Sequence, residues 1–189
     1  MSDSLRLITI YGSVRPGRLC DRVAAWVAER VARWPEFDVD AVDPRAIGPV
    51  ENGDEVDRAV ALEERFAAAD AFLVITPEYN HGYPAPLKRL IDMVGVPWQA
   101  KPVGFVSYGG ISGGLRAVEQ LRQVFAELHA VTIRDTVSFP GAHRQFGPGG
   151  GLLDPAWSER AMDVLLARLR WWALALRDAR ALRPYTLAA

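Results

Sequence analysis

A stretch near the start of the chain, IYGSVRPGRLCD at residues 10–21, has residue types that bind phosphate groups. Gly12 and Gly17 have the spacing of a P-loop for nucleoside triphosphates. However, Arg18 stands where that loop needs lysine, and Leu19 where it needs a magnesium-binding serine or threonine. The three spaced glycines of the dinucleotide fingerprint are absent too. Metal-assisted triphosphate chemistry is therefore disfavoured.

The same stretch suits a single phosphate bound without a metal. It leads into a predicted helix, whose first N–H groups and dipole favour an anion. Ser13 adds a hydroxyl donor, and Arg15 and Arg18 add guanidinium groups that grip phosphate oxygens in pairs. Gly17 lets the backbone approach the ligand closely. The alternative is a solvated turn with surface arginines.

A second stretch, TPEYNHGYPAPLK at residues 76–88, combines polar and aromatic groups after an apolar run. Pro77 stiffens the exit from that run, and four side chains suited to a flat heteroaromatic ring follow it: Glu78, Tyr79, Asn80 and His81. The alternative is an ordinary turn before a proline-led helix.

A third stretch, SYGGISGG at residues 107–114, has four glycines within six residues. Glycines leave bare backbone against which a planar ligand can lie, and Tyr108 is placed to cover one edge of it. One glycine cluster is a weak signal, but three such stretches after strands make a stronger one.

The elements that must position these stretches alternate along the chain. Apolar runs predict strands over residues 5–11, 37–42, 71–76, 102–108 and 131–139. Helical spacing of apolar residues predicts helices over 19–34, 56–69, 85–94, 115–129 and 155–180. In the second of these helices, the residues expected to face inward are Val60, Leu62 and Phe66. Residues 43–53 are expected to form a loop, and 140–154 a mobile lid.

This alternation, without a break in composition, predicts one α/β domain over residues 1–189. We expect a three-layer flavodoxin-like fold whose five-stranded parallel sheet has the order 2-1-3-4-5. Ligands in such folds bind beyond the carboxyl ends of the strands, at the switch between strands 1 and 3. The three unusual stretches meet there.

Bulk properties exclude several classes of function. The net charge of −1 provides no electrostatic footprint for nucleic acid or an anionic membrane. A single cysteine, Cys20, excludes an internal disulfide and a multi-cysteine metal site. No signal peptide is evident, and the apolar stretch 171–176 is far too short to span a bilayer. We therefore expect a soluble, cytoplasmic protein that needs no metal.

Three motifs together, GSVRPGR, PEYNHGYPAPLKRLID and YGGISGGLRAVEQLR, resemble the NAD(P)H-dependent FMN reductase family over about Leu5 to Val137. The resemblance implies a flavodoxin-like fold, bound FMN, NAD(P)H as hydride donor, and a homodimer or a dimer of dimers. It places five residues around the FMN phosphate: Ser13, Arg15, Arg18, Leu19 and Cys20. It places four residues along the isoalloxazine ring, Pro77, Glu78, Tyr79 and Asn80, and five at its other edge, Ser107, Tyr108, Gly109, Gly110 and Gly113. Many members have serine and asparagine where this chain has Arg18 and Cys20.

The resemblance implies an FMN-dependent NAD(P)H oxidoreductase that passes electrons to free flavin, a quinone or a similar small-molecule acceptor. Flavin N5 would carry the chemistry, so no catalytic side chain is expected. The alternative is a flavodoxin-like electron carrier that never meets nicotinamide. Cys20 is either a reactive thiolate near a helix start or a small packing residue. The last helix is apolar on more than one side, which predicts a subunit contact.

Overall fold

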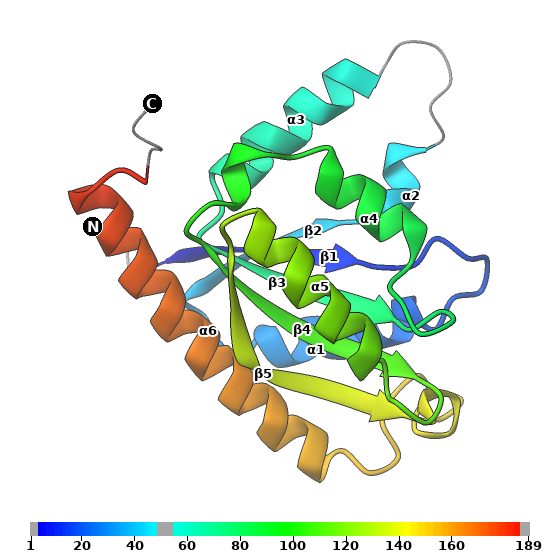
Figure 1. Ribbon diagram of the computed structural model, residues 1–189. Coiled ribbons are helices and arrows are strands. Elements are labelled where there is room, and N and C mark those ends of the chain that lie inside the picture. Colours follow the sequence, from blue (N-terminus) through cyan, green and yellow to red (C-terminus); the bar gives the residue numbers. More distant parts are fainter. Residues whose placement is uncertain (1–3, 49–54, 186–189) are drawn as a thin grey trace.

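The computed structural model describes residues 4–48 and 55–185, and they form a five-stranded parallel sheet of order β2-β1-β3-β4-β5 (Figure 1). The strands are β1 (Leu5–Tyr11), β2 (Phe37–Val42), β3 (Ala71–Pro77), β4 (Pro102–Gly109) and β5 (Val131–Pro140). The predicted sheet order is therefore confirmed, and so is the placement of β2 at an edge. Every residue of β3, the central strand, is buried.

Helices cover both faces of the sheet and complete three layers (Figure 1). They are α1 (Cys20–Val31), α2 (Pro44–Ile47), α3 (Glu55–Ala67), α4 (Ala85–Asp92), α5 (Leu115–Glu127) and α6 (Ala156–Leu182), with the 3-10 turns η1 (Val96–Trp98) and η2 (Ala142–Arg144). Side chains alternate across a strand, so Leu5 and Leu7 of β1 pack toward α1 and α6. Ile8 and Ile10 pack toward α3, α4 and α5.

One packing arrangement ties helices to the sheet, and another joins two helices of the same layer. Trp98 is fully buried, with its ring centroid 4.5–5.1 Å from those of Phe66, Phe72 and Phe125. On the other face, the buried Arg30 of α1 pairs with Glu159 at 3.0 Å and with Asp163 at 2.8 Å, both on α6. Among the described helices, none combines the length and apolar content that crossing a bilayer requires.

Two expectations from the sequence were wrong. Val60 is 50% exposed, because it lies two positions before Leu62 and so on the opposite side of α3 from Leu62 and Phe66. The expected loop 43–53 contains helix α2, which is capped by Asp43, whose side chain accepts a hydrogen bond from the Arg45 amide. Residues 49–54 of that loop lie outside the described residues.

The expected lid, residues 140–154, is folded against the domain. Ala142 and Phe146 are buried, and the Phe146 ring lies 5.3 Å from that of Phe139. A bridge pairs Phe146 with Leu152. Opening of this segment stays a prediction.

Candidate functional site

The first loop leaves β1 pressed against β3. The Gly12 amide donates to the Ile75 carbonyl at 2.8 Å, and a Cβ on Gly12 would lie 2.8 Å from that same oxygen. Only glycine fits here without moving backbone. Gly17, further along the loop, has a φ of +62°, in the left-handed region. The spacing of Gly12 and Gly17 resembles a P-loop, but both glycines are explained by the backbone conformation of this loop.

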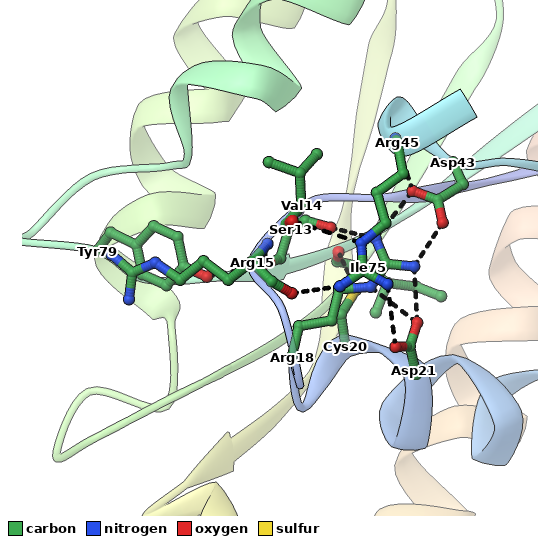
Figure 2. Close-up of polar contacts among 10 residues, drawn as sticks. All are labelled: Ser13, Val14, Arg15, Arg18, Cys20, Asp21, Asp43, Arg45, Ile75 and Tyr79. Carbon is green, nitrogen blue, oxygen red and sulfur yellow. Dashed lines mark hydrogen bonds and ion pairs between the residues drawn. The ribbon is translucent and has the colours of Figure 1, made fainter. Parts of the chain in front are cut away.

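Ser13 and Arg15 join the first loop to the second. The buried Ser13 hydroxyl lies 2.7 Å from the Tyr79 hydroxyl, and the Arg15 guanidinium stacks 3.5 Å from the centroid of the Tyr79 ring (Figure 2). Arg15 forms no ion pair with a described carboxylate. Its charge is therefore held at the site without being neutralised.

Arg18, which is expected to bind the phosphate, is paired with carboxylates of the protein. Its side chain is only 3% exposed and lies between Asp21 and Asp43 (Figure 2). Burial alone would lower the pKa of Arg18, but hydrogen bonds to the two aspartates outweigh it and raise that pKa. Arg15 and Arg18 are only three residues apart, but their side chains have different partners. Arg15 stacks on the Tyr79 ring, whereas Arg18 pairs with two aspartates.

Backbone N–H groups in the first loop supply donors for an anion. In the part of the chain that the structure describes, the amides of Val14, Leu19 and Cys20 donate to no protein acceptor. Leu19 and Cys20 stand at the start of α1, where the helix dipole is positive. These donors fit a phosphate group.

Cys20 is a buried packing residue. Its thiol is 0% exposed and lies 3.8 Å from the Ile75 carbonyl oxygen. Burial raises the pKa of Cys20 and keeps the thiol protonated. Of the two interpretations of this residue, the structure supports packing.

The second loop is a tight turn from Tyr79 to Gly82. Tyr79 and Gly82 exchange two backbone hydrogen bonds, and the residues between them, Asn80 and His81, have φ of 50° and 69°. Two successive left-handed residues define a type I′ turn, which favours asparagine. Asn80 and His81 are exposed on this turn and are not among the residues that line the crevice described below.

Glu78 ties the second loop to the third. Its carboxylate accepts hydrogen bonds from the Ser112 hydroxyl at 2.6 Å and the Arg116 amide at 3.2 Å, and it pairs with Arg116 Nε at 2.6 Å. Burial alone would raise the pKa of Glu78, but Ser112 and Arg116 outweigh it and hold that pKa below its usual value. Sequence reasoning did not identify Ser112 and Arg116.

The third loop turns sharply over the end of β4. Gly113 and Gly114 have φ of 61° and 89°, and a Cβ on Gly114 would lie 2.8 Å from the Tyr108 amide nitrogen. The buried Ser107 hydroxyl donates to the Gly113 carbonyl at 2.9 Å, so it shapes this loop. By contrast, a Cβ on Gly110 would meet nothing within 4 Å. Gly110 is therefore bare backbone facing open space.

The loops enclose a crevice of about 420 Å³ beyond the carboxyl ends of the strands. Its walls are Arg15, Leu19, Pro77, Glu78, Tyr79, Tyr108, Gly109, Gly110, Gly141, Ala142, His143 and Arg144. The volume is within the range of small-ligand sites. Sequence reasoning missed the last four residues individually, although their segment was expected to cover the site.

A second cavity of about 410 Å³ lies between α2 and α4 and is mostly apolar. Val14 borders this cavity, so the first loop separates it from the crevice. In residues 4–48 and 55–185, no group of three or more His, Cys, Asp and Glu side chains is placed to hold a metal ion. The convergence of polar groups and loops thus favours the crevice as the functional site.

Comparisons with known proteins identify the family of this chain. A family model described as NADPH-dependent FMN reductase matches residues 5–144. An NAD(P)H-dependent FMN reductase of Schizosaccharomyces pombe is 37% identical, over 63% of this chain and 64% of that protein. A probable NADPH:quinone oxidoreductase of Oryza sativa is 32% identical, over 92% of this chain and 91% of that protein.

Among solved structures, the flavoenzyme FerB of Paracoccus denitrificans, an NAD(P)H:(acceptor) oxidoreductase, has the same fold. Its TM-score is 0.66 at 20% identity, over 90% of this chain and 98% of that one. At that identity the likeness concerns the fold alone. The family match covers all five strands and the three loops, and the chain therefore belongs to the NADPH-dependent FMN reductase family.

Proposed function

We propose that this chain is an FMN-dependent oxidoreductase that takes hydride from NAD(P)H and passes electrons to free flavin, a quinone or a similar small acceptor. The observation that carries the proposal is the convergence of three loops on one crevice, with Arg15 and Leu19 of the first loop on one side and the bare glycine backbone of Gly110 on another. Membership of the family and the names of the relatives support it. A cytoplasmic location is part of the proposal.

The residues present fit FMN. The amides of the first loop, the Ser13 hydroxyl and the Arg15 guanidinium form a donor set suited to a phosphate. The open backbone at Gly110 suits a planar ring, and Tyr108 lines the same crevice. When bound, FMN supplies hydride acceptance and onward electron transfer.

The chain's own residues would bind and orient the cofactor and shield it from water. Arg15 and the first loop would hold the phosphate end, while Pro77, Tyr79 and the third loop would set the plane of the ring. Backbone N–H groups of the glycine loop would stabilise negative charge on the reduced ring. His143 and Arg144 border the same crevice and would meet the nicotinamide or the acceptor.

A visible spectrum and a turnover assay test the proposal together. The protein should be yellow as purified or after adding FMN, and it should oxidise NADPH or NADH when a quinone or free flavin is present. Colourless protein that cannot be reconstituted with FMN would overturn the proposal. Bound FMN without any NAD(P)H oxidation would instead identify an electron carrier.

We also propose that the protein forms a homodimer or a dimer of dimers, with the outer face of α6 as a contact. Trp157, Val164 and Trp171 are spaced by seven residues on α6 and are 59%, 48% and 60% exposed. Exposed tryptophans aligned on one helix face are typical of interfaces. Light scattering at micromolar concentration should give at least twice the chain mass, and Trp171→Glu should lower it. A wild-type monomer would refute this proposal.

A further inference from the structure

Arg18 is the centre of an ionic cluster beneath the first loop (Figure 2). Its guanidinium donates to both carboxylate oxygens of Asp43, at 2.8 and 2.5 Å, and its Nε donates to Asp21 at 2.7 Å. A further N–H of Arg18 donates to the carbonyl oxygen of Ser13. The side chain is thus fully engaged with protein groups.

A second arginine, Arg45 of α2, holds the next part of the same loop. Arg45 donates to the carbonyl oxygen of Arg15 and, at 3.4 Å, to that of Val14. It also approaches Asp21 at 3.6 Å. Three successive carbonyl oxygens, those of Ser13, Val14 and Arg15, therefore face two arginines (Figure 2).

This arrangement decides which backbone groups the loop offers to a ligand. A carbonyl oxygen turned toward a phosphate would repel it, whereas an amide N–H would bind it. With the carbonyls of residues 13–15 held by Arg18 and Arg45, the amides of Val14, Leu19 and Cys20 have no protein acceptor among the described residues. We propose that Arg18, locked by Asp43 and Asp21, is a positioning residue that presents the amides of this loop to the FMN phosphate.

Charge balance argues against direct binding of the phosphate by Arg18. The cluster contains two arginines and two aspartates, so its charges cancel. A phosphate replacing Asp43 on the guanidinium would approach the carboxylates of Asp43 and Asp21 and be repelled by them. Arg15, which pairs with no described carboxylate, remains the cation suited to direct contact. This inference rests on the proposed function.

Comparing FMN with riboflavin tests the inference, because riboflavin has the same ring but no phosphate. Titrations of apoprotein, followed by quenching of flavin fluorescence, give both dissociation constants. For Arg18→Met we expect FMN affinity to fall about 10- to 100-fold, the scale of lost charge-assisted hydrogen bonds. Riboflavin affinity should stay within about threefold. The matched control is Arg22→Met, on the exposed side of α1, which should change neither affinity.

Asp43→Asn separates positioning from direct binding, and it keeps the test decisive if Arg18→Met does not fold. If Arg18 binds the phosphate itself, removing the Asp43 charge frees the guanidinium and tightens FMN binding. If Arg18 positions the loop, the same change loosens the lock and weakens FMN binding, again without a change for riboflavin. Thermal unfolding confirms that each variant is folded.

Several outcomes would overturn the inference. Tighter FMN binding by Asp43→Asn would make Arg18 a direct ligand, and an equal loss of both flavins would reduce it to a general structural role. Unchanged FMN affinity in folded Arg18→Met would refute any role at the phosphate. If wild-type protein binds neither flavin, the proposed function itself fails, which is a different result from all of these.

Discussion

Glu78 allows a quantitative test of how the crevice is held together. Its carboxylate is 6% exposed and receives two hydrogen bonds and one ion pair from Ser112 and Arg116. Glu78→Gln keeps the shape of the side chain but removes the charge. We therefore expect the apoprotein to become less stable, because the third loop and the start of α5 lose their strongest tie to the second loop.

The size of the effect follows from the exposure of the two partners. Removing one member of a fully buried pair costs about 3–5 kcal/mol, whereas an exposed pair is worth about 0–1 kcal/mol. Arg116 is 46% exposed and the substituted glutamine would still accept one hydrogen bond, so we expect a loss of about 1–2 kcal/mol. In a domain of this length, that loss lowers Tm by about 2–8 °C.

The loss should depend on pH. The lowered pKa of Glu78 means that its charge stabilises the fold above the unfolded-state pKa, and this contribution disappears as pH falls through the folded-state pKa. The difference between wild type and Glu78→Gln is therefore full at about pH 7 and shrinks below about pH 4.5. Circular dichroism melts across this range measure it.

A control variant and two possible results test whether the charge of Glu78 stabilises the fold. Asp92→Asn removes the exposed Lys88–Asp92 pair, whose side chains are 37% and 54% exposed, and should cost less than about 0.5 kcal/mol. Equal melting of wild type and Glu78→Gln at neutral pH would refute the reasoning. A stability difference that does not change with pH would refute the electrostatic cause.

Three further changes test other parts of the structure. Gly12→Ala places a Cβ 2.8 Å from the Ile75 carbonyl oxygen, so urea unfolding should show a loss of about 1–3 kcal/mol, and wild-type stability would contradict this. Because burial raises its pKa, Cys20 should resist iodoacetamide in native protein and react after denaturation; rapid native labelling would disprove its burial. Burial lowers the pKa of Lys101 to about 8, so the unfolded state binds more protons between about pH 8 and pH 10. Wild type should gain stability relative to Lys101→Met as pH rises across that interval, and a flat difference would exclude the titration of Lys101.

The sheet could be predicted because each strand is a short apolar run that must be covered on both faces. Ala71–Thr76 has no polar face at all, which places it at the centre of a parallel sheet, and β3 is found there. The ends of the helices and strands were harder to predict where a single capping residue determines them. The side chain of Asp43 caps the start of α2. The prolines and glycines nearby favoured the prediction of a loop instead.

The position of the candidate site could be predicted from the sequence, but the roles of its side chains could not. Glycines mark loops that need unusual backbone, so the three loops were identified from composition. The partners of Glu78, and the Asp43 partner of Arg18, were not, because they lie in other segments of the chain that only the fold brings near. The position of Asp43 near Arg18 could have been predicted, however. β1 pairs in parallel with β2, with Ile10 opposite Val42, so the residue after β2 reaches the same sheet edge as the loop after β1.

That register explains why two arginines of one loop differ in what they can bind. A guanidinium at the carboxyl edge of the sheet is free for a ligand only if no neighbouring strand delivers a carboxylate to it. Asp43, delivered by β2, reaches Arg18, while Arg15 faces the Tyr79 ring instead. An arginine in a phosphate-binding stretch should therefore be assigned a direct contact only after the first residue beyond the neighbouring edge strand has been considered. Where that residue is acidic, we expect the arginine to shape the loop and the loop's amides to bind the anion.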